Sequence, residues 1–140
     1  MAEFANTFIQ QIAENANAIF TETPVHPKGC VVHREGSGII TLRGNTNQCY
    51  ARYLVVFGGN IAIPTGGTVG EISIALAVDG EALGSSTATV TPAAVENFFN
   101  VSAFAYINVP RGCCVNIGVK NINTQTIEMS NANIAITRVA

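Results

Sequence analysis

The chain of 140 residues has the length of one ordinary domain, and its apolar fraction of 48% is sufficient for a core of its own. Only 11% of its residues are charged, against about 25% in a typical soluble domain, and its net charge is −2. Seven scattered Lys and Arg residues do not form the basic footprint of a nucleic-acid-binding protein, and no stretch approaches the roughly 20 apolar residues of a membrane span.

The shortage of charge also bears on assembly. The cores of protein interfaces are depleted in Lys, Glu and Asp, so a chain that is poor in these residues fits a protein that works as an oligomer. The alternative is a monomer whose surface is coated with neutral residues such as Asn and Thr. We expect an oligomer.

Residues Ala2–Ile19 carry the one helical pattern of the chain, because apolar side chains recur at helical spacing and polar ones fill the opposite face. We therefore predict a short N-terminal helix within residues 1–20. A helix this short is marginal in water, so it must pack on its own domain, on sister helices or on a partner. An attachment or oligomerisation helix and an ordinary packed terminal helix are both open. A docking helix would present Phe8, Ile9, Ile12 and Ile19 to its partner.

The same N-terminal segment has no basic region and no unbroken apolar stretch. We therefore do not expect it to be a signal peptide.

From residue 21 onward, short β-rich runs alternate with turn residues, which predicts one β domain over residues 21–140. Asp79-Gly80 suits a tight hairpin turn, and Pro110-Arg111-Gly112 suits a turn with Pro at its second position. This spacing indicates an all-β fold, an antiparallel sandwich of about eight strands. The predicted strands are Gly29–His33, Gly38–Arg43, Ala51–Phe57, Glu71–Val78, Ser86–Val90, Val101–Val109, Cys114–Asn121, Thr126–Met129 and Asn133–Val139.

The four cysteines, Cys30, Cys49, Cys113 and Cys114, do not have the spacing of a zinc site. On a strand, the adjacent Cys113 and Cys114 would point to opposite faces. We expect free buried thiols, with a Cys30–Cys49 bridge left open for an oxidising setting. The sequence does not decide whether these cysteines are oxidised.

Residues that could perform catalysis are not found in any known pattern. The two histidines, His26 and His33, lack the partners of a metal-binding jelly roll, and no Gly-x-Ser-x-Gly motif is present. The nine acidic residues are dispersed along the chain rather than paired as in glycosidases. We therefore expect no enzyme, no metal and no cofactor.

Aromatic residues gather between Phe98 and Tyr106. On a strand, Phe104 and Tyr106 would share one face. Such a cluster belongs to a core, to a contact between subunits or to a platform for a ligand, and we favour the core or the subunit contact.

The closing segments carry a family resemblance. The run GCCVNIGVKN (112–121), followed by NANIAITRVA (131–140), resembles the last strands of compact trimeric jelly rolls of the tumour necrosis factor and complement-head type. Residues 103–112 are similar to the segment before the last hairpin of that family. The resemblance covers about Val31–Ala140 and extends to the heads of collagen-like spore-surface glycoproteins. Because the chain has no Gly-x-y tract, phage decoration and head-fibre proteins are the better match.

This resemblance implies a homotrimeric, non-enzymatic structural protein with a jelly-roll fold. It places Phe104, Tyr106 and Phe98 at the contact between subunits. It also implies a capsid or fibre protein as partner, and a virion as the location of a protein made in the host cytoplasm. The alternative is a receptor- or glycan-binding tip module, in which the loops Gly58–Gly70 and Asn121–Thr126 would carry recognition.

Overall fold

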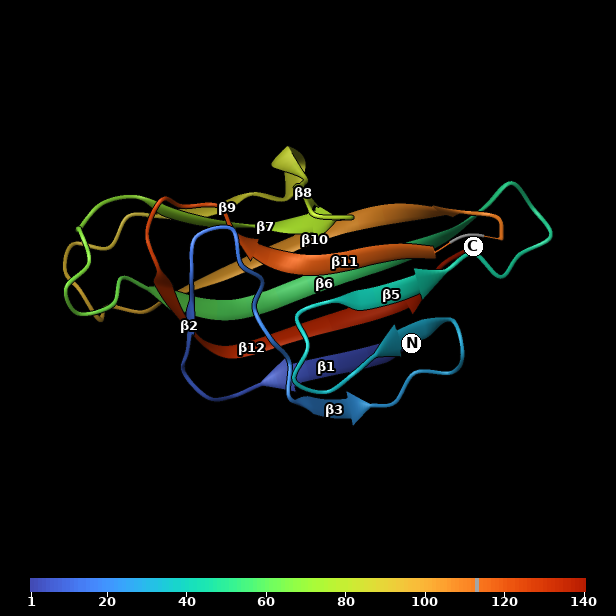
Figure 1. Ribbon diagram of the computed structural model, residues 1–140, viewed down its shortest axis with the longest axis horizontal. Coiled ribbons are helices and arrows are strands. Elements are labelled where there is room, and N and C mark those ends of the chain that lie inside the picture. The colour runs from blue at the N-terminus through green and yellow to red at the C-terminus, as the bar shows by residue number, and fades with distance from the viewer. Residues whose placement is uncertain (113) are drawn as a thin grey trace.

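The computed structural model describes residues 1–112 and 114–140, and their regular structure is almost entirely β. Two antiparallel sheets pack face to face as a sandwich (Figure 1). Sheet A has the order β10-β6-β12-β1-β3, with β2 also paired to β12, and sheet B has the order β4-β5-β11-β7-β8, with β9 also paired to β7. The predicted all-β sandwich is therefore confirmed.

The strands of sheet A are β1 (Ala2–Asn6), β2 (Gln10–Ile12), β3 (Glu22–Val25), β6 (Tyr50–Ala62), β10 (Phe99–Pro110) and β12 (Ile127–Arg138). Those of sheet B are β4 (Val31–His33), β5 (Ile40–Arg43), β7 (Ile72–Val78), β8 (Glu81–Ala82), β9 (Ala88–Val90) and β11 (Cys114–Asn121), and a 3₁₀ turn, η1 (Gly84–Ser86), joins β8 to β9. No helix in the part of the chain described is long and apolar enough to cross a membrane.

The core lies between the sheets, where the inward-facing side chains of both are almost fully buried. Each fully buried Val, Leu, Ile, Phe or Met side chain among them contributes about 1.5–3 kcal/mol relative to its exposed state. Tyr53 of β6 also ties the sheets together by a hydrogen bond, because its hydroxyl donates to the Arg43 carbonyl oxygen of β5 at 2.6 Å. Burial is the main cause that raises the pKa of Tyr53 to about 12.

The predicted N-terminal helix is wrong. Residues 2–6 form β1, which pairs with β12 so that Phe4 lies opposite Ile134. Residues 10–12 form β2, which also pairs with β12. Ala2 and Phe4 point into the core at 0% and 1% exposure, which is the two-residue period of a strand. Pairing with β12 satisfies the backbone groups, whereas an isolated helix of this length would be marginal.

Residues 13–20 are not helical either, and they pass from sheet A to sheet B along the end of β11. The Ala18 N–H donates to the Val119 carbonyl oxygen at 2.8 Å, and Asn17 forms an isolated bridge with Lys120. Phe20 then enters the core with 0% exposure. The first 20 residues are thus part of the packing of both sheets.

Two further details differ from the predicted strands. Gly58 and Gly59, expected in a loop, lie inside β6, where added Cβ atoms would come within 3.2 Å of Asn133 Oδ1 and 3.1 Å of Phe57 Cζ. The last two predicted strands are one strand, β12, interrupted by a bulge at Asn131, which has φ of 50°. The polar run there resembles a turn in sequence, but a bulge lets pairing continue on both sides.

Candidate functional site

The outer face of sheet A carries a continuous apolar surface across β10, β6 and β12. Phe104 of β10 lies opposite Val56 of β6, which lies opposite Ala135 of β12. In the next outward-facing row, Tyr106 lies opposite Leu54. We call these five residues, Leu54, Val56, Phe104, Tyr106 and Ala135, the aromatic patch.

The aromatic patch is open to solvent. Phe104 is 65% exposed and Tyr106 is 61% exposed, and Val56 is 42% exposed. Large apolar side chains that are exposed side by side on a flat sheet mark a surface that another molecule covers. Covering the two rings would contribute on the order of a few kcal/mol.

Polar side chains border the aromatic patch towards the start of β10. The Asn100 amide donates to Asn60 Oδ1 at 3.2 Å, and the Asn133 amide donates to Glu3 Oε2 at 3.1 Å.

At the other border of the patch, Arg52 Nε donates to Asn108 Oδ1 at 3.0 Å. The same guanidinium donates to the Tyr50 hydroxyl at 2.9 Å, with its central carbon 5.2 Å from the centre of the Tyr50 ring. The patch therefore has an apolar centre and a polar rim, which is the usual anatomy of a protein interface.

Strand β10 is also the edge of sheet A (Figure 1). A pocket of about 490 Å³ lies beside it, lined by residues 102–106 of β10, by Leu83 and by the turn of residues 85–87. The aromatic patch thus continues around the sheet edge into this pocket. A long edge strand with exposed apolar side chains is a site for pairing or covering by another chain.

Of the predicted interface residues, Phe104 and Tyr106 share one exposed face, and their role in assembly stays a prediction. Phe98 precedes β10 and is half-buried. Because an extended chain advances about 3.3 Å per residue, Phe98 lies about 20 Å from Phe104 and outside the aromatic patch. Sequence reasoning missed Leu54 and Val56, because β6 alternates apolar residues on both of its faces.

The residues predicted for a docking helix do not share one face. Phe8 and Ile9 are 75% and 60% exposed in the turn between β1 and β2, whereas Ile12 is buried in the core. Ile19 is partly exposed, and its backbone is held by the Gln10 side chain. An attachment role for residues 1–20 stays a prediction, now with Phe8 and Ile9 as its exposed apolar side chains.

The two loops considered for recognition meet at one end of the sandwich. The Thr68 N–H donates to Gln125 Oε1, and Gln125 Nε2 donates to the Thr68 carbonyl oxygen, both at 2.9 Å. They border a pocket of about 470 Å³ whose lining is mostly hydroxyl, amide and glycine groups: Gln11, Pro64, Thr65, Gly66, Gly67, Thr68, Gln125 and Thr126.

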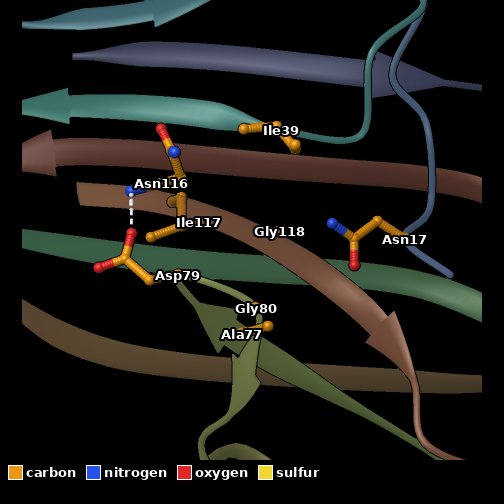
Figure 2. Close-up of a pocket in the computed structure, with 8 residues that line it drawn as sticks. All are labelled: Asn17, Ile39, Ala77, Asp79, Gly80, Asn116, Ile117 and Gly118. Carbon is orange, nitrogen blue, oxygen red and sulfur yellow. Dashed lines mark hydrogen bonds between the residues drawn. The ribbon is translucent and has the colours of Figure 1, made fainter. Parts of the chain in front are cut away.

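A smaller pocket of about 240 Å³ lies on the outer face of sheet B (Figure 2). Figure 2 shows Asp79 beside Asn116, whose backbone N–H donates to Asp79 Oδ1 at 3.0 Å, and Asn17 on the far side of Gly118. Asn17 donates in turn to the Gly38 carbonyl oxygen at 3.3 Å. These bonds hold the β7–β8 turn and the segment 13–20 in place, so the polar groups serve the fold.

The cysteines do not form the bridge that was left open. Cys30 is a half-buried free thiol whose sulfur accepts a hydrogen bond from Arg138 Nη1 at 3.5 Å, and Cys49 is an exposed free thiol. Cys114 is exposed as well, so the expectation of buried thiols is wrong for Cys49 and Cys114. Cys113 lies outside the described residues.

No group of three or more His, Cys, Asp or Glu side chains among residues 1–112 and 114–140 is arranged to hold a metal ion. His33 instead packs on Phe4, with ring centres 4.5 Å apart, and its Nε2 lies 2.9 Å from the Ser37 carbonyl oxygen.

Comparison with known proteins gives a result at the level of the fold. No family model matches the sequence, and no curated protein matches it. Among solved structures, the chain is similar to Eiger TNF from S. frugiperda, with a TM-score of 0.71 and 14% identity over 99% of this chain and 91% of that one. It is also similar to the globular domain of zebrafish complement 1qA, with a TM-score of 0.64 and 11% identity over 96% and 94% of the two chains.

A third similar structure is murine APRIL, with a TM-score of 0.59 and 9% identity over 95% of each chain. Likenesses at such low identity show the fold and nothing finer. The relation to phage decoration and spore-surface proteins stays a prediction. The chain has the jelly-roll fold of tumour necrosis factor and complement 1q domains.

Proposed function

We propose that the protein is a non-enzymatic structural module whose copies assemble into a homotrimer through the aromatic patch. The observation that supports this most directly is the exposure of Phe104 and Tyr106, at 65% and 61%, side by side next to a free sheet edge. A soluble protein rarely leaves such a surface uncovered. The low charge of the chain agrees with a surface that is partly buried in an assembly.

Phe104 and Tyr106 of the aromatic patch also line the pocket beside β10, so the outer face and the edge of sheet A form one continuous surface for a neighbouring copy. Copies that meet around a three-fold axis use such a surface in a closed ring. Three copies are what the resemblance to trimeric jelly rolls implies, and the likeness of the fold supports that number.

Light scattering across a dilution series tests this proposal. The wild-type protein should keep a mass three times its chain mass of 14.7 kDa. The double variant Phe104→Ser/Tyr106→Ser should be a folded monomer. The matched control, Val32→Ser/Ile39→Ser, removes two apolar side chains outside the aromatic patch that are 42% and 50% exposed, and it should stay trimeric.

A wild-type monomer at every concentration, or a trimer that survives in the patch variant, would contradict the proposal.

The biological setting of this assembly, a phage capsid or fibre, is a further part of the proposal and has its support in the sequence resemblance. Residues 1–20 would then attach the trimer to the particle through Phe8 and Ile9.

In purified phage particles the protein should co-sediment with the shell. The variant Phe8→Ser/Ile9→Ser should lose sedimentation but keep its trimeric mass, and wild-type protein that stays in the supernatant would refute the setting.

A receptor- or glycan-binding tip is the second candidate, favoured by the way in which Gln125 joins two loops around a polar pocket. Amide and hydroxyl groups of this kind suit sugar hydroxyls. Binding to a glycan array, lost on Gln125→Ala but kept on Thr87→Ala at the pocket beside β10, would support this candidate. An array without any bound glycan would remove glycans as the ligand.

A further inference from the structure

Two carboxyl groups that are far apart in the sequence meet at the end of the sandwich where β12 begins, opposite the C-terminus (Figure 1). Glu128 lies on β12 with Ala62 of β6 and Gln11 of β2 as its register partners. It is only 8% exposed, and its Oε1 atom has no hydrogen-bond partner. A buried carboxylate in such a place is costly unless it is neutralised.

Glu96 supplies the other carboxyl from the loop of residues 91–98. Its Oε1 accepts hydrogen bonds from the Thr65 backbone N–H at 3.0 Å and from the Thr65 hydroxyl at 3.1 Å. Its own N–H donates to the Ile63 carbonyl oxygen at 2.8 Å. These contacts hold Glu96 at φ of 61°, in the left-handed region that a residue with a side chain seldom adopts. They place Glu96 beside Ile63, whose chain neighbour Ala62 is the register partner of Glu128.

A hydrogen bond between the two carboxyl groups is a cause of both of their pKa shifts, and such a bond requires one proton between them. Burial first, and then Glu96, raise the pKa of Glu128 above its ordinary value of 4.5. The hydrogen bond from Glu128 first, and then the Thr65 N–H, lower the pKa of Glu96.

The other contributor to the pKa of Glu128 is the neutral Gln11 side chain, which lowers it. Among the described residues, no Lys, Arg or His contributes to the pKa of either carboxyl. The pair therefore titrates as one unit.

We propose that Glu96 and Glu128 form a proton-dependent latch that holds the loop of residues 91–98 against sheet A. With one proton the two carboxyl groups are joined by a hydrogen bond, and without it two negative charges face each other and the loop is released at this point. The loop leads directly into β10, so opening of the latch would loosen the attachment of the first residues of β10 to sheet A. Any effect of the latch on assembly rests on the proposed function, whereas the latch itself does not.

The direction of the pH effect follows from the two shifts. Because folding raises the pKa of Glu128, this residue stabilises the folded state fully below pH 4.5, and the stabilisation is lost as the pH rises through the raised pKa of Glu128. Because folding lowers the pKa of Glu96, this residue stabilises the folded state above pH 4.5, and the stabilisation is lost as the pH falls through the lowered pKa of Glu96. The latch is therefore closed between these two pKa values and opens on the alkaline side of this window.

The test is denaturant unfolding of the full chain from about pH 4 to about pH 9, in which the wild-type unfolding constant should rise by up to about 10-fold per pH unit between 4.5 and the folded-state pKa of Glu128 and level off above it. Glu128→Gln keeps the shape and an N–H donor for Glu96 but has no proton to lose, so this rise should disappear. Glu71→Gln is the matched control, because it removes the same charge from an exposed loop and should follow the wild type. Parallel curves for all three proteins would overturn the latch.

A second measurement uses the wild-type protein alone, so it does not depend on the folding of a variant. Carbon-13 NMR of the glutamate carboxyls should show one group that titrates above 4.5, together with faster amide exchange in residues 94–98 at alkaline pH. Titration of every glutamate near its ordinary pKa would refute the latch. Stabilisation by calcium ions at neutral pH that Glu128→Gln abolishes would show a cation site in its place.

Discussion

At the scale of single residues, Gly118 illustrates how the crossing of segment 13–20 over β11 depends on the absence of a side chain. A Cβ atom at this position would lie 2.7 Å from Asn17 Nδ2 and 2.8 Å from the Gly38 carbonyl oxygen. The second of these atoms is backbone and cannot move away without a shift of the strand entry.

We therefore predict that Gly118→Ala destabilises the protein by about 1–3 kcal/mol, the usual effect of overpacking. Gly70→Ala is the matched control, because a Cβ there would meet nothing within 4 Å, and it should leave stability nearly unchanged. Urea denaturation of both variants measures the difference. Equal midpoints for the two variants would mean that the crossing tolerates a methyl group.

Residue-level features of the candidate sites could be predicted only in part from the sequence. The shared face of Phe104 and Tyr106 follows from strand alternation, which is a local property. The meeting of Glu96 with Glu128 could not be predicted, because the two lie on separate segments and acids that are dispersed in sequence carry no signal of contact. Their juxtaposition depends on the path of the loop before β10, which the fold sets.

At the scale of elements, the first strand is the part of the fold that the sequence predicted incorrectly. The segment contains both a helical and a two-residue apolar period, and local patterns do not decide between them. Pairing with the backbone of β12 over five residue pairs stabilises this segment as a strand. The later strands were predictable because Gly, Pro and Asp-Gly turns separate alternating runs, as with Asp79-Gly80 before β8.

Because β1 lies between β12 and β3 inside sheet A, we expect its loss to unfold the protein rather than release a free arm. Phe4→Ala should cost about 3–5 kcal/mol, as for other buried aromatic residues. Phe8→Ala, which truncates a side chain that is 75% exposed, is the control and should have little effect on stability. Thermal unfolding followed by circular dichroism checks both variants. A Phe4→Ala protein as stable as the control would restore the idea of an independent N-terminal segment.

At the scale of the whole molecule, the likeness to tumour necrosis factor and complement 1q domains was accessible from the last strands of the sequence, and the structure confirms the fold. What one chain alone does not contain is the partner surface. Phe104 and Tyr106 belong both to the aromatic patch and to the pocket beside β10, and the surface of a second copy that would cover them is visible only in an assembly.

The composition of the aromatic patch determines how its assembly should respond to salt. Its five residues carry no charge, and Arg52 at its border is already engaged by Asn108 and Tyr50 of the same chain. Contacts between exposed charges are screened as the Debye length falls from about 30 Å at 0.01 M salt to about 3 Å at 1 M, whereas apolar burial is not. We therefore predict the same trimer mass in light scattering from about 0.01 M to about 1 M NaCl. Dissociation at high salt would assign the contact to charged groups instead, and the aromatic patch would then need a different partner.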